Sequence, residues 1–399
     1  MAPPSRYRIR IFGTSWHAAT AALALALTMA IPLAQAQTYT VIHNFTGFQD
    51  GMLPYAGLTL DKAGNLYGTT FEGGRAGNGT VFKLRHFSSG WIFSPLYSFN
   101  GSNDGQAPQA RVVFGPDGTL YGTTYRGGGN GCEGAGCGMV FNLKPTPTPP
   151  PTALTPWIET VLYRFRGGAD GSLPGYGDLV FDEAGNLYGT TINGGSNDEG
   201  VVYELTPSGG GWTESVLYSF TGKLDGSTPY SGVIFDQAGN LYGTNTTGLG
   251  AYGRVYQLTP SGSGWIEHTL YGFTGGNDGA YPVGGVISDQ SGNLYGTTNS
   301  TAYGGGGTVF ELKPSNGGWM FNLLYSFTGN QLQGPYASLA MDAAGNLYGT
   351  TYGDGAYGLG SVFKLTPSGG SWTYTDLHDF SGSDGQNPAG GVVLGVCRE

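Results

Sequence analysis

The sequence has 399 residues, of which 75 are glycine and 13 % are aromatic, whereas only 11 % are charged. Intrinsically disordered chains are rich in charged residues and poor in aromatic ones, so this composition excludes that class. The formal net charge of −10 disfavours a protein that binds nucleic acid or an anionic lipid surface.

Residues 1–36 have the pattern of a signal peptide for secretion. Three arginines lie within the first ten residues, the apolar run Ala18–Leu33 follows, and Ala34–Ala36 is a small-x-small cleavage site. A retained membrane anchor is the alternative, but the run is short for a bilayer span. Cleavage would leave 14 basic and 27 acidic residues, which gives a net charge of −13. The rest of the sequence contains no stretch of about 20 apolar residues. We therefore expect a secreted, periplasmic or extracellular protein without a membrane span.

A motif of six residues, Asn-Leu-Tyr-Gly-Thr-Thr or a close variant, recurs six times after this leader. The copies are 53 or 54 residues apart, except for one interval of 67 residues that contains the Pro-rich insertion 144–156. A repeat of this length is typical of propellers, solenoids and arrays. The copies begin at Asn65, Thr119, Asn186, Asn240, Asn293 and Asn346.

Each copy divides into four strand-like runs separated by turn residues. In the fourth copy these runs are 231–235, 240–245, 254–258 and 265–273. Four antiparallel strands in a unit of this length are typical of a propeller blade, and closing the array into a ring covers both faces of each sheet. We therefore predict an all-β fold, a β-propeller of four-stranded blades that forms one repeat domain over residues 37–399, with the insertion 144–156 in the second blade.

The two ends of the repeat array decide the predicted number of blades. Thr38–Gly47 matches the fourth strand of a copy, and Val392–Leu394 matches the first. If both belong to one blade, the ring has seven blades of which the last is incomplete, and this is our leading expectation. Six blades with spare terminal strands is the main alternative, and a right-handed β-solenoid is the third.

Two sets of aspartates recur in every or nearly every copy. One set precedes glycine in the loop after the fourth strand, and the other lies in the turn between the first and second strands. A ring of carboxylates suits Ca²⁺, but aspartate followed by glycine is also ordinary turn chemistry, which we favour, so we expect no metal site. The sets are Asp50, Asp104, Asp170, Asp225, Asp278 and Asp384, and Asp61, Asp117, Asp182, Asp236, Asp289 and Asp342.

Two of the three cysteines, Cys132 and Cys137, lie in one Gly-rich loop. Because an exported protein meets an oxidising compartment, we predict a local disulfide between them. Cys397 is left over in a C-terminal tail that does not match the repeat.

The loops that leave the second strand vary most among the copies. Propeller topology places them on the same face as the loops that leave the fourth strand, and variable loops on a rigid frame are where ligand specificity usually lies. Their aromatic and polar side chains suit a sugar ring, although such aromatic residues also serve as spacers folded onto the frame. The candidate ligand-binding residues are Phe71, Tyr125, Tyr252, Tyr303, Asp354 and Tyr357.

The sequence contains no recognisable catalytic signature. No HExxH, GxSxG or Cys/His arrangement is visible, and no cofactor is expected. A secreted hydrolase or lyase acting on carbohydrate is nevertheless the alternative function, since acids from separate blades can meet in space. Its candidate residues are Asp178, Asp198, Glu199 and Asp354.

The tandem pattern LYSFTG..DG..P..GV.FD.AGNLYGTT resembles the bacterial GloVer tandem-repeat proteins over essentially the whole mature chain. Because the array is regular and shows no catalytic asymmetry, we expect a secreted or cell-surface protein with a binding or structural role, and polysaccharide or another surface component as its partner. The resemblance implies a secreted repeat protein and little else. It brings no established activity with it. A shortened gene product without an independent role is a third interpretation.

Overall fold

A computed structural model describes residues 38–395, except 102, 148–156, 263, 303 and 330–333. The chain divides into two units, Met1–Thr40 and Val41–Glu399, and every described strand lies in the second. The predicted signal peptide lies outside the described residues.

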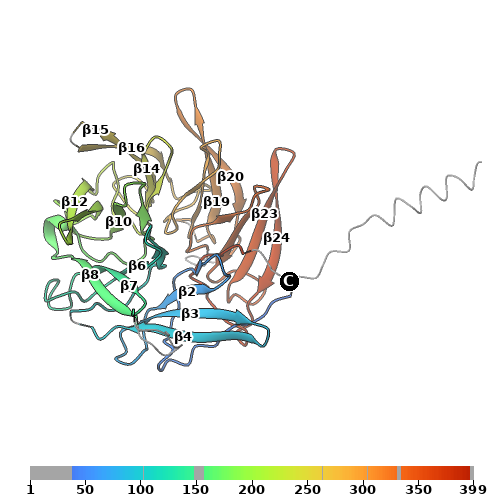
Figure 1. Cartoon of the computed structure of the whole chain (residues 1–399). Helices are drawn as coiled ribbons and strands as arrows, with labels where there is room; N and C mark the ends of the chain where they lie inside the picture. The colour runs from blue at the N-terminus through green and yellow to red at the C-terminus, as the bar shows by residue number, and fades with distance from the viewer. Residues whose placement is uncertain are drawn as a thin grey trace, which may run out of the picture. The chain divides into compact units, whose positions relative to one another are not determined.

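The described strands form six antiparallel sheets of four strands each, and in every sheet the strands are paired in chain order. We number these sheets as blades 1 to 6, and Figure 1 shows them following one another around a common centre. The first strands are β1 (Thr59–Leu60), β5 (Val113–Phe114), β9 (Val180–Phe181), β13 (Ile234–Phe235), β17 (Ile287–Ser288) and β21 (Ala340–Met341). The second strands are β2 (Leu66–Thr70), β6 (Leu120–Thr124), β10 (Leu187–Thr191), β14 (Leu241–Asn245), β18 (Leu294–Thr298) and β22 (Leu347–Thr351).

The outer half of each blade is a long hairpin. The third strands are β3 (Thr80–Phe87), β7 (Met139–Lys144), β11 (Val201–Ser208), β15 (Arg254–Ser261), β19 (Thr308–Ser315) and β23 (Ser361–Ser368). The fourth strands are β4 (Gly90–Ser98), β8 (Ile158–Arg164), β12 (Gly211–Ser219), β16 (Gly264–Gly272), β20 (Gly318–Ser326) and β24 (Ser371–Asp379). The only helix among the described residues is the short 3-10 helix η1 (Gly168–Asp170). The predicted all-β propeller with four-stranded blades is confirmed.

The second strands carry the repeat motif because they are the most enclosed elements of the fold. Each pairs with two strands of its own sheet, and all five residues of β2, for example, are buried. Gly68 at the centre of β2 lies opposite Phe82 of β3, and a Cβ at this glycine would come within 2.6 Å of the Phe82 ring. Glycine therefore lets the aromatic ring of the third strand lie flat against the second.

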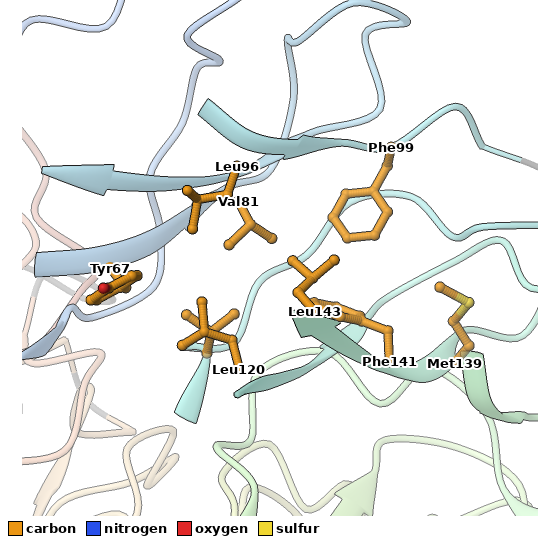
Figure 2. Packing of buried hydrophobic residues seen from close by; sticks show 9 residues of the cluster. Tyr67, Val81, Leu96, Phe99, Leu120, Met139, Phe141 and Leu143 are labelled. Atoms are coloured by element: carbon orange, nitrogen blue, oxygen red, sulfur yellow. The ribbon is translucent and has the colours of Figure 1, made fainter. Parts of the chain in front are cut away.

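The hydrophobic core is divided into layers between successive blades. In the first layer, Tyr67, Val81, Leu96 and Phe99 of blade 1 face residues of blade 2 (Figure 2). The blade 2 residues in this layer include Leu120, Met139, Phe141 and Leu143. Four further layers repeat this arrangement between the later blades. The blades therefore stabilise one another, as expected for sheets that cannot bury both faces alone.

The ring closes where the last innermost segment meets the first blade. A Cβ at Gly390 would lie 2.7 Å from the carbonyl oxygen of Ala56, so the two backbones are in direct contact. This closure excludes the solenoid.

The structure has six four-stranded blades, which is the alternative arrangement and not the leading expectation of seven. Thr38–Gly47 and Val392–Leu394 do not form strands and do not pair with each other. The physical reason is that the first and fourth strands of a blade are never neighbours. They need a second and a third strand between them, and no described residue supplies these.

Candidate functional site

The innermost segments of the blades surround a central cavity of about 480 Å³. All six blades contribute to its wall, and residues 389–392 contribute at the closure point. Because nearly all of the wall is built from the same short stretch of each copy, sequence differences among the repeats are brought together at this cavity.

Tyrosines gather along this cavity. Tyr55, Tyr176, Tyr336 and Tyr352 line it, and Tyr230 contacts Tyr176 with ring centroids 4.7 Å apart. Tyr336 and Tyr352 form a second ring contact at 5.0 Å. The cavity therefore presents aromatic faces from several blades.

Burial keeps the phenol groups of four of these tyrosines, Tyr55, Tyr176, Tyr230 and Tyr336, neutral at physiological pH. Burial, together with the neighbouring Tyr230 and Tyr125, raises the pKa of Tyr176 to about 12. Burial is also the main cause of the raised pKa values of Tyr55, Tyr230 and Tyr336. Each group can therefore both donate and accept a hydrogen bond.

One ion pair and several neutral polar groups complete the cavity wall. The guanidinium of Arg111 lies 2.8 Å from the carboxylate of Asp178, and the Arg111 backbone N–H donates to the same carboxylate at 3.1 Å. Gln109, Ser231 and Ser338 also line the wall. Asp178, one of the candidate catalytic acids, thus faces the cavity with its charge already paired.

A second cavity of about 360 Å³ lies beside the loops of blades 1 and 2. It is lined by Phe71 and Tyr125, together with polar residues that include Glu72 and Arg126. The Arg126 guanidinium lies over the Tyr125 ring, 5.5 Å from its centroid.

Ring contacts link the two cavities. Tyr55 lies 5.6 Å from Phe71, and Tyr125 lies 6.3 Å from Tyr176, both measured between centroids. A continuous aromatic surface therefore runs from the central cavity to the second one.

Of the five candidate ligand-binding residues that the structure describes, it brings together two, Phe71 and Tyr125. Tyr252 contacts Tyr281 at 6.1 Å and lines neither cavity, and Tyr357 is 65 % exposed. The backbone carbonyl of Asp354 accepts from the Gly360 N–H at 2.9 Å, and this residue also lines neither cavity. Tyr303 lies outside the described residues.

The other candidate catalytic acids are not part of the central cavity. The carboxylate of Asp198 accepts from the Gly194 backbone N–H at 2.8 Å within its own loop, and Glu199 packs against Gly222. Among the described residues of the cavity wall, Asp178 is the single carboxylate.

The repeated aspartates hold turns. In the loop after β12, the Asp225 carboxylate accepts from the Thr221 N–H at 2.8 Å and from the Tyr218 hydroxyl at 3.1 Å. Gly226 follows with a φ of +81°, which favours glycine. The described residues contain no group of three His, Cys, Asp or Glu side chains placed to hold a metal ion.

The second set of aspartates closes the turns before the second strands. Asp236 accepts from the Ala238 and Asn240 N–H groups and from the Tyr242 hydroxyl, at 2.8–3.0 Å. Burial alone would raise the pKa of Asp236, but the hydrogen bonds from Asn240, Tyr242 and Ala238 together outweigh burial, and the net shift is downward. The carboxylate therefore stays ionised as part of the turn.

The structure contains a disulfide between Cys132 and Cys137, whose Cα atoms are 5.2 Å apart. Cys137 is buried next to Phe165 and Leu179, so the bond attaches the Gly-rich loop to the layer between blades 2 and 3. Cys397 lies outside the described residues.

Sequence reasoning missed most of the cavity residues. Tyr55, Tyr230 and Tyr336 directly follow a proline in a stretch that is otherwise regular, and Tyr176 lies two residues after Pro174. The corresponding residues in other copies are Gln109, Val283 and Ala389. The feature of the sequence that could have identified them is that the residue type varies among the copies at this one position, shortly before each innermost strand.

The repeats match a known family model over nearly the whole chain. The sequence matches the model of the Gloeobacter/Verrucomicrobia repeat at residues 27–250, 135–329 and 184–397. No curated protein matches it significantly. No helix among the described residues is long and apolar enough to cross a bilayer.

Several solved structures are similar to this chain at low sequence identity. A candidate 6-phosphogluconolactonase from Bacteroides uniformis is 15 % identical, with a TM-score of 0.52 and coverage of 81 % of this chain and 84 % of that chain. A candidate oxidoreductase (glucose dehydrogenase) from Thermus thermophilus is 16 % identical, with a TM-score of 0.47 and coverage of 82 % and 96 %. A gluconolactonase from Xanthomonas campestris is 15 % identical, with a TM-score of 0.43 and coverage of 75 % and 84 %. The likeness to the Bacteroides uniformis protein, at 15 % identity, concerns the fold alone.

Proposed function

The chain belongs to the Gloeobacter/Verrucomicrobia repeat family, and from that premise we propose that it is an exported repeat protein that binds a carbohydrate chain at its central cavity. The observation that carries the proposal is the convergence of neutral tyrosines with amide and hydroxyl groups in a cavity of about 480 Å³. The leader-like residues 1–36 support export.

Sugar rings fit this arrangement because they have two kinds of surface. Their C–H faces pack on aromatic rings, and their hydroxyls need partners that both donate and accept hydrogen bonds. Tyr176 and Tyr336 offer both, and Gln109 supplies an amide. The cavity volume falls in the range of ordinary small-ligand sites, which is about 300–1,000 Å³.

The charges favour a neutral glycan over an acidic one. Without residues 1–36 the chain carries 14 basic and 27 acidic residues, so an anionic polymer approaches against the field of the protein. Arg111 is the only basic residue in the cavity wall among the described residues, and Asp178 already pairs with it.

Binding is favoured over cleavage by the number of carboxylates. Glycoside hydrolysis ordinarily uses two carboxyl groups on either side of the bond. The described wall of the cavity holds Asp178 alone, and Arg111 already holds its carboxylate in an ion pair. The hydrolase or lyase alternative remains a prediction that a search for released sugar can test.

The experiment is a glycan array followed by calorimetry on residues 37–399. We expect Tyr176→Ala and Tyr336→Ala each to weaken binding of the selected glycan at least tenfold, because each removes a stacking face. Tyr357→Ala is the matched control, since this exposed tyrosine lies outside both cavities. Equal affinities in all three variants, or no glycan bound by the unchanged protein, would contradict the proposal. Release of reducing or unsaturated sugar would favour the enzyme.

A further inference from the structure

One position of the innermost segments is charged in two neighbouring blades and uncharged in the others. Arg111 of blade 2 and Asp178 of blade 3 each lie three residues before the last residue of the first strand. The residues at the same position of the other four blades are Gly57, Gly232, Gly285 and Ser338. The blades accept a small uncharged residue here, so the requirements of the fold do not explain the two charges.

The junction between blades 2 and 3 also lacks a hydrogen bond that the repeat forms elsewhere. In the other blades, the fourth residue of the second strand is a threonine whose hydroxyl donates to a backbone carbonyl of the next innermost segment, at 2.8–3.3 Å. The hydroxyl of the corresponding Thr123 is buried and has no hydrogen-bond partner among the described residues. Instead, the Arg111 backbone N–H donates to the Asp178 carboxylate at 3.1 Å. A buried polar group without a partner costs free energy, and such departures from a repeated pattern are typical of functional sites.

Both charged groups line the central cavity and have unused hydrogen-bonding capacity. Each of the two side chains is 39 % exposed, and the guanidinium of Arg111 lies 2.8 Å from the carboxylate of Asp178. A guanidinium has five N–H donors and a carboxylate has about four acceptor sites. The contacts between these two residues use one guanidinium donor and two acceptor sites. Donors and acceptors therefore remain side by side for a bound molecule.

Two adjacent hydroxyl groups of a sugar ring match this pair of side chains. A hydroxyl both donates and accepts, so one hydroxyl can donate to Asp178 while its neighbour accepts from Arg111. Hydrogen bonds to charged groups are roughly twice as strong as those between neutral groups. Tyr176 lines the same cavity and offers an aromatic ring to the C–H face of the sugar.

We propose that Arg111 and Asp178 are the specificity-determining residues of the central cavity and select sugars with two adjacent free hydroxyl groups. This inference rests on the proposed function, because it requires that a carbohydrate enters the cavity. It narrows the class of ligand to neutral glycans that carry no O-methyl or O-acetyl group on the hydroxyls facing blades 2 and 3. A site that hydrogen-bonds a hydroxyl discriminates strongly against an analogue that lacks it, because the polar groups of the site then lose their partner.

The test is calorimetry with four neutral tetrasaccharides, built from glucose, mannose, galactose or xylose, each in free and in per-O-methylated form. We expect at least one free tetrasaccharide to bind, and to bind at least about tenfold more tightly than its methylated form. Arg111→Gly and Asp178→Gly should each remove most of this preference. Both variants copy the residue that blades 1, 4 and 5 have at this position, so each should keep the fold and change the melting temperature little. Asp178→Asn keeps the size of the side chain and should also lower the preference, so the test does not depend on how well glycine is tolerated.

Lys313→Thr is the matched control for the loss of an ion pair. Lys313 lies 3.1 Å from Glu311 and lines neither cavity. Threonine is the residue at the corresponding position of blades 3, 4 and 6, namely Thr206, Thr259 and Thr366. This variant should change neither the affinity for the tetrasaccharides nor the preference for free hydroxyls.

The possible results separate this inference from the proposed function. If a tetrasaccharide binds and Tyr176→Ala weakens its binding, but Arg111→Gly and Asp178→Gly keep the full preference for free hydroxyls, the inference is overturned and the proposed function stands. Equal affinities of the unchanged protein for the free and the methylated forms would likewise overturn the inference alone. If no tetrasaccharide binds, both are overturned.

Discussion

Replacing Glu159, Glu214 and Glu267 together by glutamine should stabilise the propeller at pH 8 and leave its stability nearly unchanged at pH 4.5. These glutamates occupy one position in the fourth strands of blades 2, 3 and 4. At the corresponding position the other blades carry aromatic residues; Phe321, for example, stacks on Tyr271 of the preceding blade at 4.6 Å. In blades 2, 3 and 4 a carboxylate therefore occupies a position at which the other blades have an aromatic ring.

Burial is the main cause of the perturbed titration of these groups. It raises the pKa of Glu159 and of Glu214 to about 7, and the neighbouring Asp104 and Asp170 add to the shift. It raises the pKa of Glu267 to about 6. Because the folded state binds these protons more tightly than the unfolded chain, their contribution to stability is full below pH 4.5 and is lost as the pH rises through 6 to 7.

The magnitude follows from the pKa values and the exposure. A rise from 4.5 to about 7 corresponds to about 3 kcal/mol for a fully enclosed group. These side chains are only half-buried, so solvent screening reduces the expected effect to about 1 kcal/mol each for Glu159 and Glu214 and less for Glu267. The triple variant should thus gain about 2 kcal/mol at pH 8.

The assay is urea unfolding at pH 4.5, 6, 7 and 8, with the variant and the unchanged protein compared at each pH. Glu183→Gln is the matched control, because it removes a carboxylate that is exposed in a turn instead of a half-buried one. If the difference in free energy of unfolding between the triple variant and the unchanged protein is the same at every pH, the inference that burial raises the pKa of these glutamates is refuted.

The packing of the blades and loops leads to three more expected outcomes. Gly226→Val should lower the free energy of unfolding by about 2 kcal/mol or more, measured by thermal unfolding, because φ is +81° and a Cβ would lie 2.2 Å from the Asn245 side chain. Added Ca²⁺ should not raise the melting temperature of the unchanged protein. Val309→Ala should lower the free energy of unfolding by about 2 kcal/mol and Val362→Ala by less than about 1, because Val309 is fully buried and Val362 is partly exposed. Equal losses would show that Val362 is as well buried as Val309. Replacing Cys132 and Cys137 by serine should change the melting temperature little, because so short a loop loses little chain entropy when closed, whereas limited proteolysis should cut that loop faster.

The repeat spacing was sufficient to predict the blades, because alternation and turn residues are local properties of the chain. The motif at Asn240 and the three runs around it correspond to β13 to β16 within a few residues. The leading expectation of seven blades was wrong because it rested on the similarity of Thr38–Gly47 and Val392–Leu394 to strands of the repeat. Two segments pair as strands only if they lie side by side in the fold, and similarity to the repeat does not show that they do.

The site was harder to predict for a related reason. Phe71 and Tyr125 lie in variable loops and could be proposed from the sequence, and both line a cavity. Tyr55, Tyr230 and Tyr336 lie in the regular part of the repeat, where a structural role is the simpler interpretation. Only the circular arrangement brings Tyr55 and Tyr336, which are 281 positions apart in sequence, around one cavity.

The contact between Ala56 and Gly390 also has a consequence for the order of folding. Neighbouring blades join residues about 53 positions apart in sequence, whereas this contact closes a loop of 334 residues. The chain entropy lost on closing the longer loop exceeds that of the shorter by about 1.6 kcal/mol. The closure between blade 6 and blade 1 should therefore form last and open first. In native-state hydrogen exchange, the amides of β1 and β21 should exchange before those of β9 and β13, which lie inside the row of blades.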